Sequence, residues 1–425
     1  MEGFVHFKWN DYICKKISDM ISKRSIQDAI STQCQSIGKK KSYTREALKD
    51  MPFGVKNYAL IITGIRRCGK STLLEQLMES QAASGRNILY LNFDVPALYG
   101  FTFDSFQLLD MIIEEKGYKT LFFDEIQVVE GWEVYVRSKL ESGFEVVITG
   151  SNASLLSREL GTKLTGRHID RELFPFSFSE FCGFKSMVPS SYSLAEYLNL
   201  GGFPAFLETQ EPAILGELVN DIIYRDIAVR YGINDENTLK MCFSLLLSNF
   251  GGLISASKLK QQLGVKSTTT ITDYLSFFRQ TYLLDFIPKF SFSAKAQVIN
   301  PKKVYCVDTG ILSVVNKNFS ENAGKKLENA VYAELRRKNK EIFYYSNALH
   351  ECDFILANSL VPHTAVQVCY KLTPENLNRE VSGLVFAMDE LNIGNGVIIT
   401  FDDEDTIVKD GKTIEVVPFY KYFAS

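Results

Sequence analysis

One short stretch decides the fold of this chain of 425 residues: Gly64-Ile65-Arg66-Arg67-Cys68-Gly69-Lys70-Ser71. It fits the pattern G-x-x-x-x-G-K-[ST] without a mismatch. The apolar residues 58–62 before it predict a buried strand, and residues 72–80 after it predict a helix. A glycine-rich turn between a strand and a helix offers inward-facing N–H groups and the positive end of the helix to an anion. The stretch therefore predicts a phosphate-binding loop.

This loop predicts ATP and Mg²⁺ as the cofactors. We expect Lys70 to reach the β- and γ-phosphates and Ser71 to hold the Mg²⁺ ion. The residues expected to bind the nucleotide are Gly64, Ile65, Arg66, Arg67, Cys68, Gly69, Lys70, Ser71 and Thr72.

A second stretch, residues 119–125, is an apolar strand that ends in Asp124 and Glu125, the Walker B pattern. We expect Asp124 to bind Mg²⁺ through water and Glu125 to polarise the attacking water as a catalytic residue. A buried strand with an acidic turn is the alternative. The phosphate loop favours the catalytic interpretation, because open α/β sheets bind ligands at the carboxyl ends of their strands.

Residues 145–149 predict a further strand, which Gly150, Ser151 and Asn152 follow. Asn152 is the candidate for a polar side chain that touches the γ-phosphate or orients the water. The alternative is that Ser151 or Asn152 only caps a helix that begins near Ala153.

The composition is that of an ordinary globular protein, with 46% hydrophobic residues and a net charge of −3. This charge gives no general indication of a nucleic-acid partner, although a local basic face remains open. Eight cysteines and four histidines show no metal-binding spacing, so we expect reduced cysteines and a cytoplasmic protein. The N-terminus lacks a signal-peptide pattern and no window approaches 18 uninterrupted apolar residues, which predicts no membrane association.

The patterns along the chain divide it into five segments. We expect an α/β protein whose core has a parallel sheet with helices on both faces, from strands at 58–63, 87–93, 119–124, 145–149 and 168–174. The expected segments are a helical N-terminal segment at 1–54, this core at 55–175, a helical lid at 176–235, a winged-helix-like segment at 236–310 and a small α/β domain at 311–425.

The fourth segment predicts helices at 238–248, 255–263 and 267–281, then strands near 283–290 and 302–307. This is the plan of a winged helix, which can read a DNA major groove or serve as a contact module. The third helix would present Thr268, Thr269, Thr270 and Asp273, and the wing would carry Lys289, Lys295, Lys302 and Lys303.

The last segment predicts a helix at 327–338 with Glu328 in its first turn, and strands at 343–345 and 352–356, the second holding Asp353. A strand at 365–372 would place Gln367, Cys369 and Lys371 on one face, because alternate residues of a strand share a face.

Several segments carry a resemblance to a known family: GIRRCGKST, LFFDEIQ, ITGSN, LTGRHIDRELFPFSFSEF, YLNLGGFP, KVYCVDTGI, LENAVYAEL, ECDFIL and QVCY. They resemble the uncharacterised prokaryotic AAA-type (P-loop) ATPases that carry a C-terminal domain of unknown function. This resemblance covers nearly the whole chain. It implies ATP binding and hydrolysis, a winged-helix segment and a terminal fold similar to restriction endonucleases.

The same resemblance makes Arg167 similar to an arginine finger, which would stabilise charge on the γ-phosphate of a neighbouring subunit. It would imply self-association. The alternative is an arginine that pairs structurally with Asp170 or Glu172, and Arg158 and Arg171 are rival candidates for the finger.

Restriction-type nucleases hold Mg²⁺ with an acidic helix residue, an aspartate and an E-x-K strand. Glu328 and Asp353 match the first two, but Gln367 and Cys369 stand where the acid and the lysine belong. An amide is a poor Mg²⁺ ligand and a thiol prefers softer metals. Lys371 would substitute only in part, so we expect this domain to be inactive as a nuclease.

The leading interpretation is an ATP-driven switch or motor, an ATPase whose C-terminal domains bind a protein or DNA partner. One alternative is an ATP-gated DNA nuclease or defence protein, which Gln367 and Cys369 argue against. Another is a nucleotide-binding regulator that hydrolyses nothing, which the intact Glu125 argues against.

Overall fold

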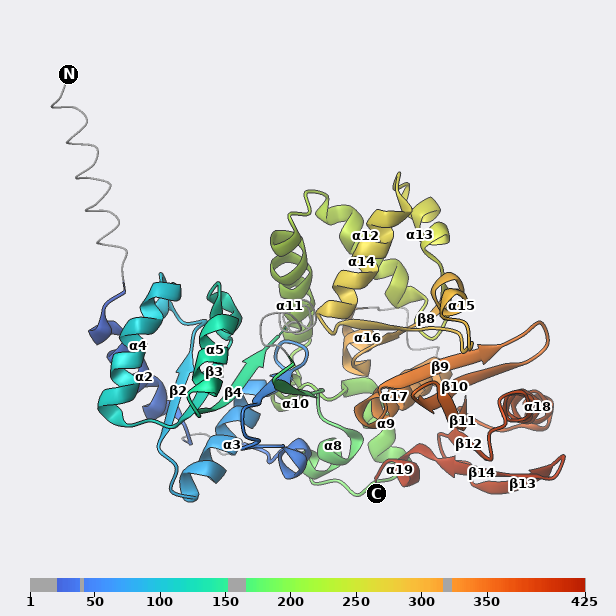
Figure 1. Ribbon diagram of the computed structural model, residues 1–425. Coiled ribbons are helices and arrows are strands. Elements are labelled where there is room, and N and C mark those ends of the chain that lie inside the picture. Colours follow the sequence, from blue (N-terminus) through green and yellow to red (C-terminus); the bar gives the residue numbers. More distant parts are fainter. Residues whose placement is uncertain (1–20, 39–41, 152–165, 316–322, 425) are drawn as a thin grey trace. The chain divides into compact units, whose positions relative to one another are not determined.

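The computed structural model describes residues 21–38, 42–151, 166–315 and 323–424. The chain forms two compact units (Figure 1). The first consists of Met1–Gly64 and Gly69–Leu173, and the second of Ile65–Cys68 and Phe174–Ser425. The turn of the phosphate loop is thus grouped with the second unit.

A parallel sheet forms the centre of the first unit, in the order β2-β3-β4-β1-β5. Its strands are β1 (Ala59–Thr63), β2 (Ile88–Asn92), β3 (Thr120–Asp124), β4 (Glu145–Gly150) and β5 (His168–Glu172). The α-helices described in this unit are α2 (Lys23–Ser36), α3 (Lys70–Ala83), α4 (Phe106–Lys116) and α5 (Trp132–Glu141), with 3-10 turns η1 (Glu46–Asp50), η2 (Pro96–Leu98), η3 (Phe103–Ser105) and η4 (Ile126–Val128). The predicted parallel sheet and α/β class are confirmed.

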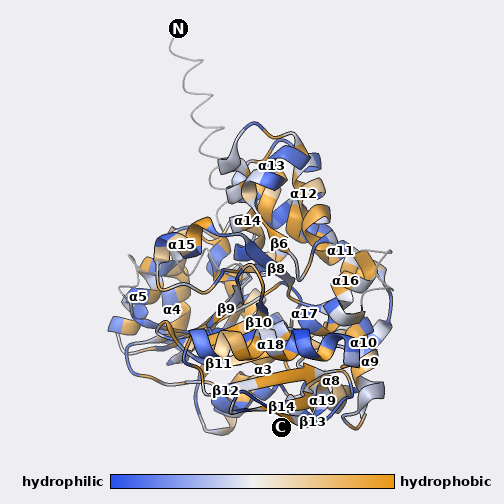
Figure 2. Cartoon of the chain, turned by 90° about the vertical axis from the view of Figure 1, so that its right-hand side faces the viewer, coloured by the Kyte–Doolittle hydropathy of each residue, from blue (hydrophilic) through white to orange (hydrophobic). Residues whose placement is uncertain are grey.

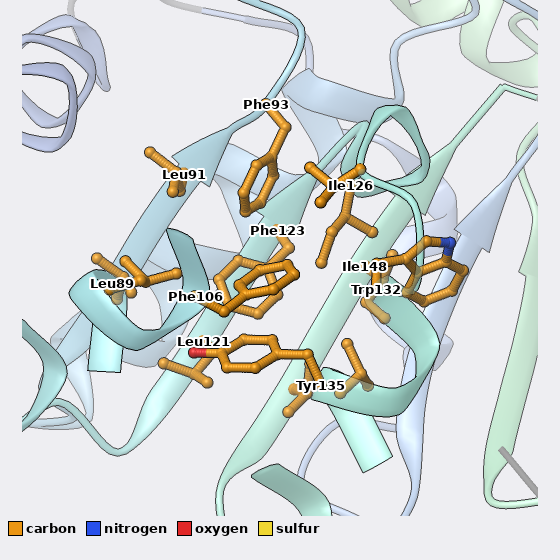
Figure 3. Close-up of a cluster of buried hydrophobic side chains, with 14 of the residues drawn as sticks. Leu89, Leu91, Phe93, Phe106, Leu121, Phe123, Ile126, Trp132, Tyr135 and Ile148 are labelled. Atoms are coloured by element: carbon orange, nitrogen blue, oxygen red, sulfur yellow. The ribbon is translucent and has the colours of Figure 1, made fainter. Parts of the chain in front are cut away.

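Helices cover both faces of this sheet, because its strands are apolar on both sides. On one face, side chains of alternate strand residues pack with α2, α4 and α5 (Figure 3). Phe106 of α4 and Tyr135 of α5 stack there with ring centroids 3.9 Å apart. The other face holds the remaining alternate residues, such as Phe122, and α3 packs against β3 and β4. The sheet is therefore held rigidly, with its strand ends in a fixed relation.

The second unit begins with the predicted helical segment. Its elements are α8 (Phe178–Lys185), α9 (Ser191–Leu200), α10 (Pro204–Thr209), α11 (Ala213–Asp221) and the π-helix η5 (Ile222–Val229). Ser177 and Glu180 form a capping box at the start of α8, in which each side chain accepts a hydrogen bond from the other residue's backbone N–H at 3.0 Å. Such boxes satisfy backbone donors at a helix start, which explains the sequence SFSE at this point.

Three helices and a small antiparallel sheet follow. The elements are α12 (Glu236–Ser248), β6 (Leu253–Ile254), α13 (Ala256–Leu263), α14 (Thr268–Gln280), β7 (Leu284–Ile287), α15 (Ala294–Ile299) and β8 (Lys302–Cys306), with sheet order β6-β8-β7. The three predicted helices are confirmed within two residues at each end, and Ser255 caps α13. The prediction missed β6 and α15, which are too short to show a period.

A mixed sheet of six strands completes the second unit, in the order β13-β14-β12-β11-β10-β9. The elements here are α16 (Thr309–Val315), α17 (Ala323–Lys338), β9 (Glu341–Ser346), β10 (Glu351–Asn358), β11 (Val361–Cys369), α18 (Pro374–Glu390), β12 (Asn395–Thr400), β13 (Asp405–Lys409), β14 (Lys412–Pro418) and α19 (Phe419–Tyr422). Figure 2 shows α18 with both hydrophobic and hydrophilic residues, as expected of a helix with one buried face. Strands β13 and β14 and helix α19 were not predicted.

Two predicted positions in this sheet region are wrong. Helix α17 begins at Ala323, so Glu328 lies in its second turn rather than its first. Strand β11 ends at Cys369, because its pairing with β12 stops there, so Lys371 lies outside the strand and is exposed. Lys371 therefore does not continue the face that Gln367 and Cys369 share.

The seven cysteines in the described residues are free thiols. No helix in the described ranges has the length and apolarity needed to cross a membrane.

Candidate functional site

Two glycines shape the phosphate loop. Gly64 has a φ of +136°, and a Cβ there would lie 2.0 Å from the backbone oxygen of Leu173. Gly69 has a φ of +102° and precedes the first residue of α3. Side chains are strained at such φ values and would not fit at Gly64. Only glycine therefore gives the backbone path that the pattern predicts.

Lys70, the first residue of α3, folds back over the loop. Its side chain is buried, and Nζ donates a hydrogen bond of 3.0 Å to the backbone oxygen of Gly64. The ammonium is therefore held inside the curve of the loop. Ser71 follows on the first turn of α3 and is exposed, while Thr72 is half-buried.

The arginines of the loop make ion pairs that the sequence did not suggest. Within the second unit, Arg66 donates to both carboxylate oxygens of Asp226 on η5, at 2.7 and 2.9 Å. Arg67 donates to Asp221 at the end of α11, at 2.7 Å. Arg66 and Arg67 were expected only to bind nucleotide. The carboxylates at 221 and 226 were visible in the sequence, but their partners lie more than 150 residues away.

The Walker B carboxylate Asp124 is fully buried at the carboxyl end of β3. Its Oδ1 accepts a hydrogen bond from the hydroxyl of Thr149 on β4. Its Oδ2 accepts hydrogen bonds of 3.2 Å from the Tyr90 hydroxyl and from the Asn92 amide. Burial and the nearby Asp124 raise the pKa of Tyr90, which therefore stays a neutral donor. Together these contacts hold the Asp124 carboxylate in one orientation.

Glu125 lies just beyond the strand in the left-handed conformation, with a φ of +53°. Its backbone N–H donates to Thr149 Oγ1 at 3.3 Å, and its Oε2 accepts hydrogen bonds from Gln127 and, at 3.3 Å, from the Ser151 hydroxyl. The Thr149 hydroxyl thus connects both Walker B residues. Residues whose backbone is strained in this way, and which several partners hold, are characteristic of functional sites.

Several residues at this site escaped the sequence analysis, Asn92 and Gln127 among them. Thr149 and Tyr90 looked like ordinary strand residues, because nothing local shows that they face Asp124. Glu75 lies one turn beyond Ser71 on α3, and burial and the charges of Asp124 and Glu79 raise the pKa of its carboxyl group. Ser151, expected only as a possible cap, bonds to Glu125. Asn152 and Arg158 lie outside the described residues.

Arg167 precedes β5 in the first unit. Its guanidinium donates to Glu141 at the end of α5 at 3.1 Å, and both side chains are substantially exposed. The structural alternative named Asp170 or Glu172 as its partner, so the contact with Glu141 is a different one. Arg171 donates to the backbone oxygen of Asp170 at 3.0 Å.

A separate group of charges lies in the second unit. Lys303 on β8, Glu328 on α17, and Glu351 and Asp353 on β10 form what we call the Lys303 cluster. Nζ of Lys303 lies 3.2 Å from Glu328, 2.8 Å from Glu351 and 2.8 Å from Asp353. The Lys303 side chain is only 3% exposed. Its predicted place on a DNA-facing wing is therefore wrong, because β8 is buried from Lys303 to Cys306 and the ammonium is paired with the three carboxylates.

The other lysines assigned to the wing differ in exposure. Lys295 is exposed, whereas Lys289 and Lys302 are half-buried. On α14, Thr268, Thr269 and Asp273 are exposed as expected and Thr270 is half-buried.

The two residues that depart from the nuclease pattern are both engaged elsewhere. The Gln367 amide donates to Glu380 of α18 at 2.7 Å and accepts from the Asp353 backbone N–H at 3.2 Å. The Cys369 thiol donates to the backbone oxygen of Lys371 at 3.1 Å, and burial raises its pKa to about 11. Neither group is directed toward Lys303 by these contacts.

The chain has the parallel sheet, the phosphate-loop sequence and the acidic strand end of a P-loop protein. Residues 56–182 match the family described as an AAA domain, and residues 191–322 match a domain of unknown function (DUF8612). An uncharacterized protein of Methanocaldococcus jannaschii is 33% identical over 439 residues, which cover 96% of this chain and 97% of that protein. An uncharacterized protein of Haemophilus influenzae is 33% identical over 355 residues, covering 78% and 87% respectively.

The chain therefore belongs to the family of these two proteins, and it combines an AAA domain with a domain of unknown function. The resemblance to AAA-type ATPases is confirmed at this level. A solved structure of the replication initiator DnaA bound to AMPPCP and single-stranded DNA aligns with 55% of this chain and 85% of that chain, at 14% identity. Its TM-score of 0.28 is too low to support a conclusion about this chain.

Proposed function

We propose that this protein binds Mg²⁺-ATP at residues 64–72 and hydrolyses it. The observation that carries the proposal is the pair of strand ends in one sheet, with the phosphate loop after β1 and the buried Asp124 at the end of β3. Ligands of open parallel sheets bind at the carboxyl ends of the strands. The AAA-domain match over residues 56–182 supports the same conclusion.

The residues present fit a magnesium–nucleotide group. Gly64 and Gly69 give the loop its backbone path, with φ values of +136° and +102°, and the Lys70 ammonium is held against the Gly64 backbone oxygen. In this proposal the loop's N–H groups and the Lys70 ammonium bind the phosphates, while the Ser71 hydroxyl and Asp124 hold the ion, directly or through water. Bound Mg²⁺ neutralises charge on the phosphate oxygens.

Glu125 is the residue we propose to orient and polarise the attacking water. Its carboxylate is held by Ser151 and Gln127, and its backbone by Thr149. A carboxylate fixed in this way favours hydrolysis over a regulator that only binds nucleotide. Asn152 remains our proposed second polar group at the same strand end.

We further propose that Arg167 acts in trans as an arginine finger when copies of the chain associate. Its ion pair with Glu141 is exposed, with side chains 42% and 56% exposed respectively. Exposed pairs contribute about 0–1 kcal/mol, so this contact would give way easily to a phosphate.

For the second unit, we propose that residues 236–310 form a winged helix and that residues 311–425 form a nuclease-like domain without nuclease activity. Two observations support the winged helix: the order of its elements, α12, β6, α13, α14, β7, α15 and β8, and the sheet order β6-β8-β7. A helix followed by three strands, a helix and a further strand, from α17 to β12, supports the nuclease-like fold. We also retain the expected segment boundaries at residues 54, 175 and 235. We propose that the winged-helix and nuclease-like segments bind a partner.

DNA and protein are the two candidate partners, and the exposed Lys295 distinguishes them. If DNA binds, affinity falls steeply with salt, because phosphate contacts release counterions. Lys295→Glu would then weaken binding to all sequences alike, and Lys340→Glu, an exposed lysine outside this segment, would not. Absence of DNA binding at low salt would leave a protein partner.

The hydrolysis proposal is tested by two substitutions and a matched control. Lys70→Ala should abolish ATP binding in a titration with Mg²⁺. Glu125→Gln should keep binding and lose turnover by roughly two orders of magnitude or more, because the water is no longer polarised. Glu115→Gln, an exposed glutamate on α4, should change neither. A wild-type chain that binds no ATP would overturn the proposal.

A further inference from the structure

The nuclease-like arrangement of the second unit implies a Mg²⁺ ion held by Glu328 and Asp353, and the residues present do not fit one. The Lys303 ammonium lies within hydrogen-bond distance of both carboxylates, at 3.2 Å from Glu328 Oε1 and 2.8 Å from Asp353 Oδ1. A cation that these two residues held in common would need the space that this nitrogen takes.

Both carboxylates also accept hydrogen bonds from donors other than Lys303. Asp353 Oδ2 accepts the backbone N–H of Val368 at 3.0 Å, and Glu328 Oε1 accepts the Tyr305 hydroxyl at 2.6 Å as well as Lys303. Mg²⁺ requires oxygen ligands at about 2.0–2.1 Å in near-octahedral geometry. Oxygens that already accept N–H and O–H groups would have to give these up, and the donors would be left buried without a partner.

The third carboxylate of the Lys303 cluster, that of Glu351, is also paired with the Lys303 ammonium, at 2.8 Å. The amide of Gln367, at the position of the missing carboxylate, is committed to Glu380 and to the Asp353 backbone. Within the described ranges, no three His, Cys, Asp or Glu residues are arranged to hold a metal ion. The lysine comes from β8, which belongs to a different sheet from the strands that carry Asp353 and Gln367.

We propose that the Lys303 ammonium is a built-in counter-ion that takes the place of the divalent cation in the terminal domain. This domain consequently binds no divalent metal at Glu328 and Asp353, and it cuts no phosphodiester there. The inference is independent of the proposed nucleotide site at residues 64–72. It also assigns Lys303 a role opposite to the DNA contact that its basic neighbours suggested.

The direct test removes the ammonium and asks whether a metal enters. All variants carry Lys70→Ala, which removes nucleotide-linked metal binding at the phosphate loop, and the full chain is used. Lys303→Met keeps the apolar stem and deletes the charge, and Lys302→Met on the same strand is the matched control. Mn²⁺ binding is counted by electron paramagnetic resonance of the free ion, and melting temperature is followed as Mn²⁺ is added.

The expected result is one additional Mn²⁺ per chain for Lys303→Met, with a rise in its melting temperature. Neither appears with Lys303 intact or with Lys302→Met, and both disappear when Asp353→Asn is added. A folded Lys303→Met chain that gains no Mn²⁺ site overturns the proposal. If Lys303→Met does not fold, a second comparison decides the question. It sets the Lys70→Ala chain, which retains Lys303, against the same chain with Asp353→Asn added. Mn²⁺ binding or plasmid cleavage that depends on Asp353 in the presence of Lys303 refutes the counter-ion role, and its absence supports it.

Discussion

Arg66 and Asp226 are joined by two parallel hydrogen bonds, from Nε to Oδ2 at 2.9 Å and from Nη2 to Oδ1 at 2.7 Å. This fork-shaped pairing is the strongest geometry available to an arginine and a carboxylate. Asp226 lies on the π-helix η5, a rare element that is frequent at functional sites. The contact therefore fixes an arginine of the phosphate loop to one defined position.

The first prediction compares the two arginine pairs of the loop. Arg66 and Asp226 are 24% and 15% exposed, whereas Arg67 and Asp221 are 42% and 29% exposed. Asp226→Ala removes two hydrogen bonds from a largely buried guanidinium and should lower the free energy of unfolding by about 1–3 kcal/mol. Asp221→Ala should cost about 0–1 kcal/mol, because solvent screens that pair. Urea denaturation followed by circular dichroism measures both, and equal losses would contradict this assignment.

The second prediction concerns the Thr149 hydroxyl, which bonds to Asp124 and to the backbone of Glu125. Thr149→Val keeps the shape of the side chain and removes these bonds. Since one such bond is worth about 1–1.5 kcal/mol, turnover of ATP should fall roughly ten-fold. ATP affinity should change little, because the phosphate loop is untouched. Thr120→Val, at the opposite end of β3, is the control and should leave turnover unchanged.

The third prediction tests association through Arg167. The ATPase rate per subunit should rise with protein concentration, because each site would need an arginine from a neighbour. Arg167→Ala should bind ATP and turn over slowly. Mixing Arg167→Ala with Lys70→Ala should restore part of the activity, since the second variant supplies the arginine. The control Glu141→Ala removes only the carboxylate that pairs with Arg167 and should retain full turnover. An ATPase rate per subunit that does not depend on protein concentration, with no activity restored on mixing, would show that each chain acts alone.

The fourth prediction follows from Asp308, which is buried beside α16. Its carboxylate accepts the backbone N–H groups of Gly202 at 2.6 Å and Gly310 at 2.8 Å. Burial raises its pKa from 3.8 to about 6, although the backbone donors and Arg337 oppose the rise. The folded state therefore binds the Asp308 proton more tightly than the unfolded state does. The stability that this proton binding contributes is complete below about pH 4 and is lost as the pH rises through 6.

The size of this effect should be roughly 3 kcal/mol, because each tenfold difference in proton affinity corresponds to 1.36 kcal/mol. The measurement is urea unfolding of the wild type and Asp308→Asn between pH 4 and pH 7. As the pH rises, the free energy of unfolding of the wild type should fall relative to that of Asp308→Asn. A difference that stays constant across this range would show that Asp308 has an ordinary pKa in the folded protein.

Local patterns were sufficient for most of the first unit. The glycines and Lys70 of the phosphate loop, and the apolar run before Asp124, carry their meaning within a few residues, because backbone conformation and strand burial are local properties. The helix periods at 255–263 and 267–281 are local in the same way, and a serine caps each of these helices. Contacts around Asp124 were not predictable, since Tyr90 and Thr149 reach it only after the strands have paired.

The misassignment of Lys303 has the same physical origin. A lysine is normally exposed, and Lys302 and Lys303 look alike in the sequence. Their difference arises because the side chain of Lys303 meets Glu328 and Asp353, which lie 25 and 50 residues later in the chain. A buried lysine is tolerated only with such partners. The one available signal was Tyr305, two residues on and therefore on the same face of the strand as Lys303.

The Lys303 cluster also has a consequence for the order in which the chain can mature. Strand β8 leaves the ribosome before α17 and β10, so Lys303 is made before any of the carboxylates that neutralise it. Until those segments are synthesised, its ammonium must stay hydrated, and β8 cannot settle into its final inward orientation. A nascent chain that stops short of residue 353 therefore lacks the charges that allow the small three-stranded sheet to close. The inward orientation of Lys303 thus depends on charges supplied by Glu328, Glu351 and Asp353, which follow it in the chain.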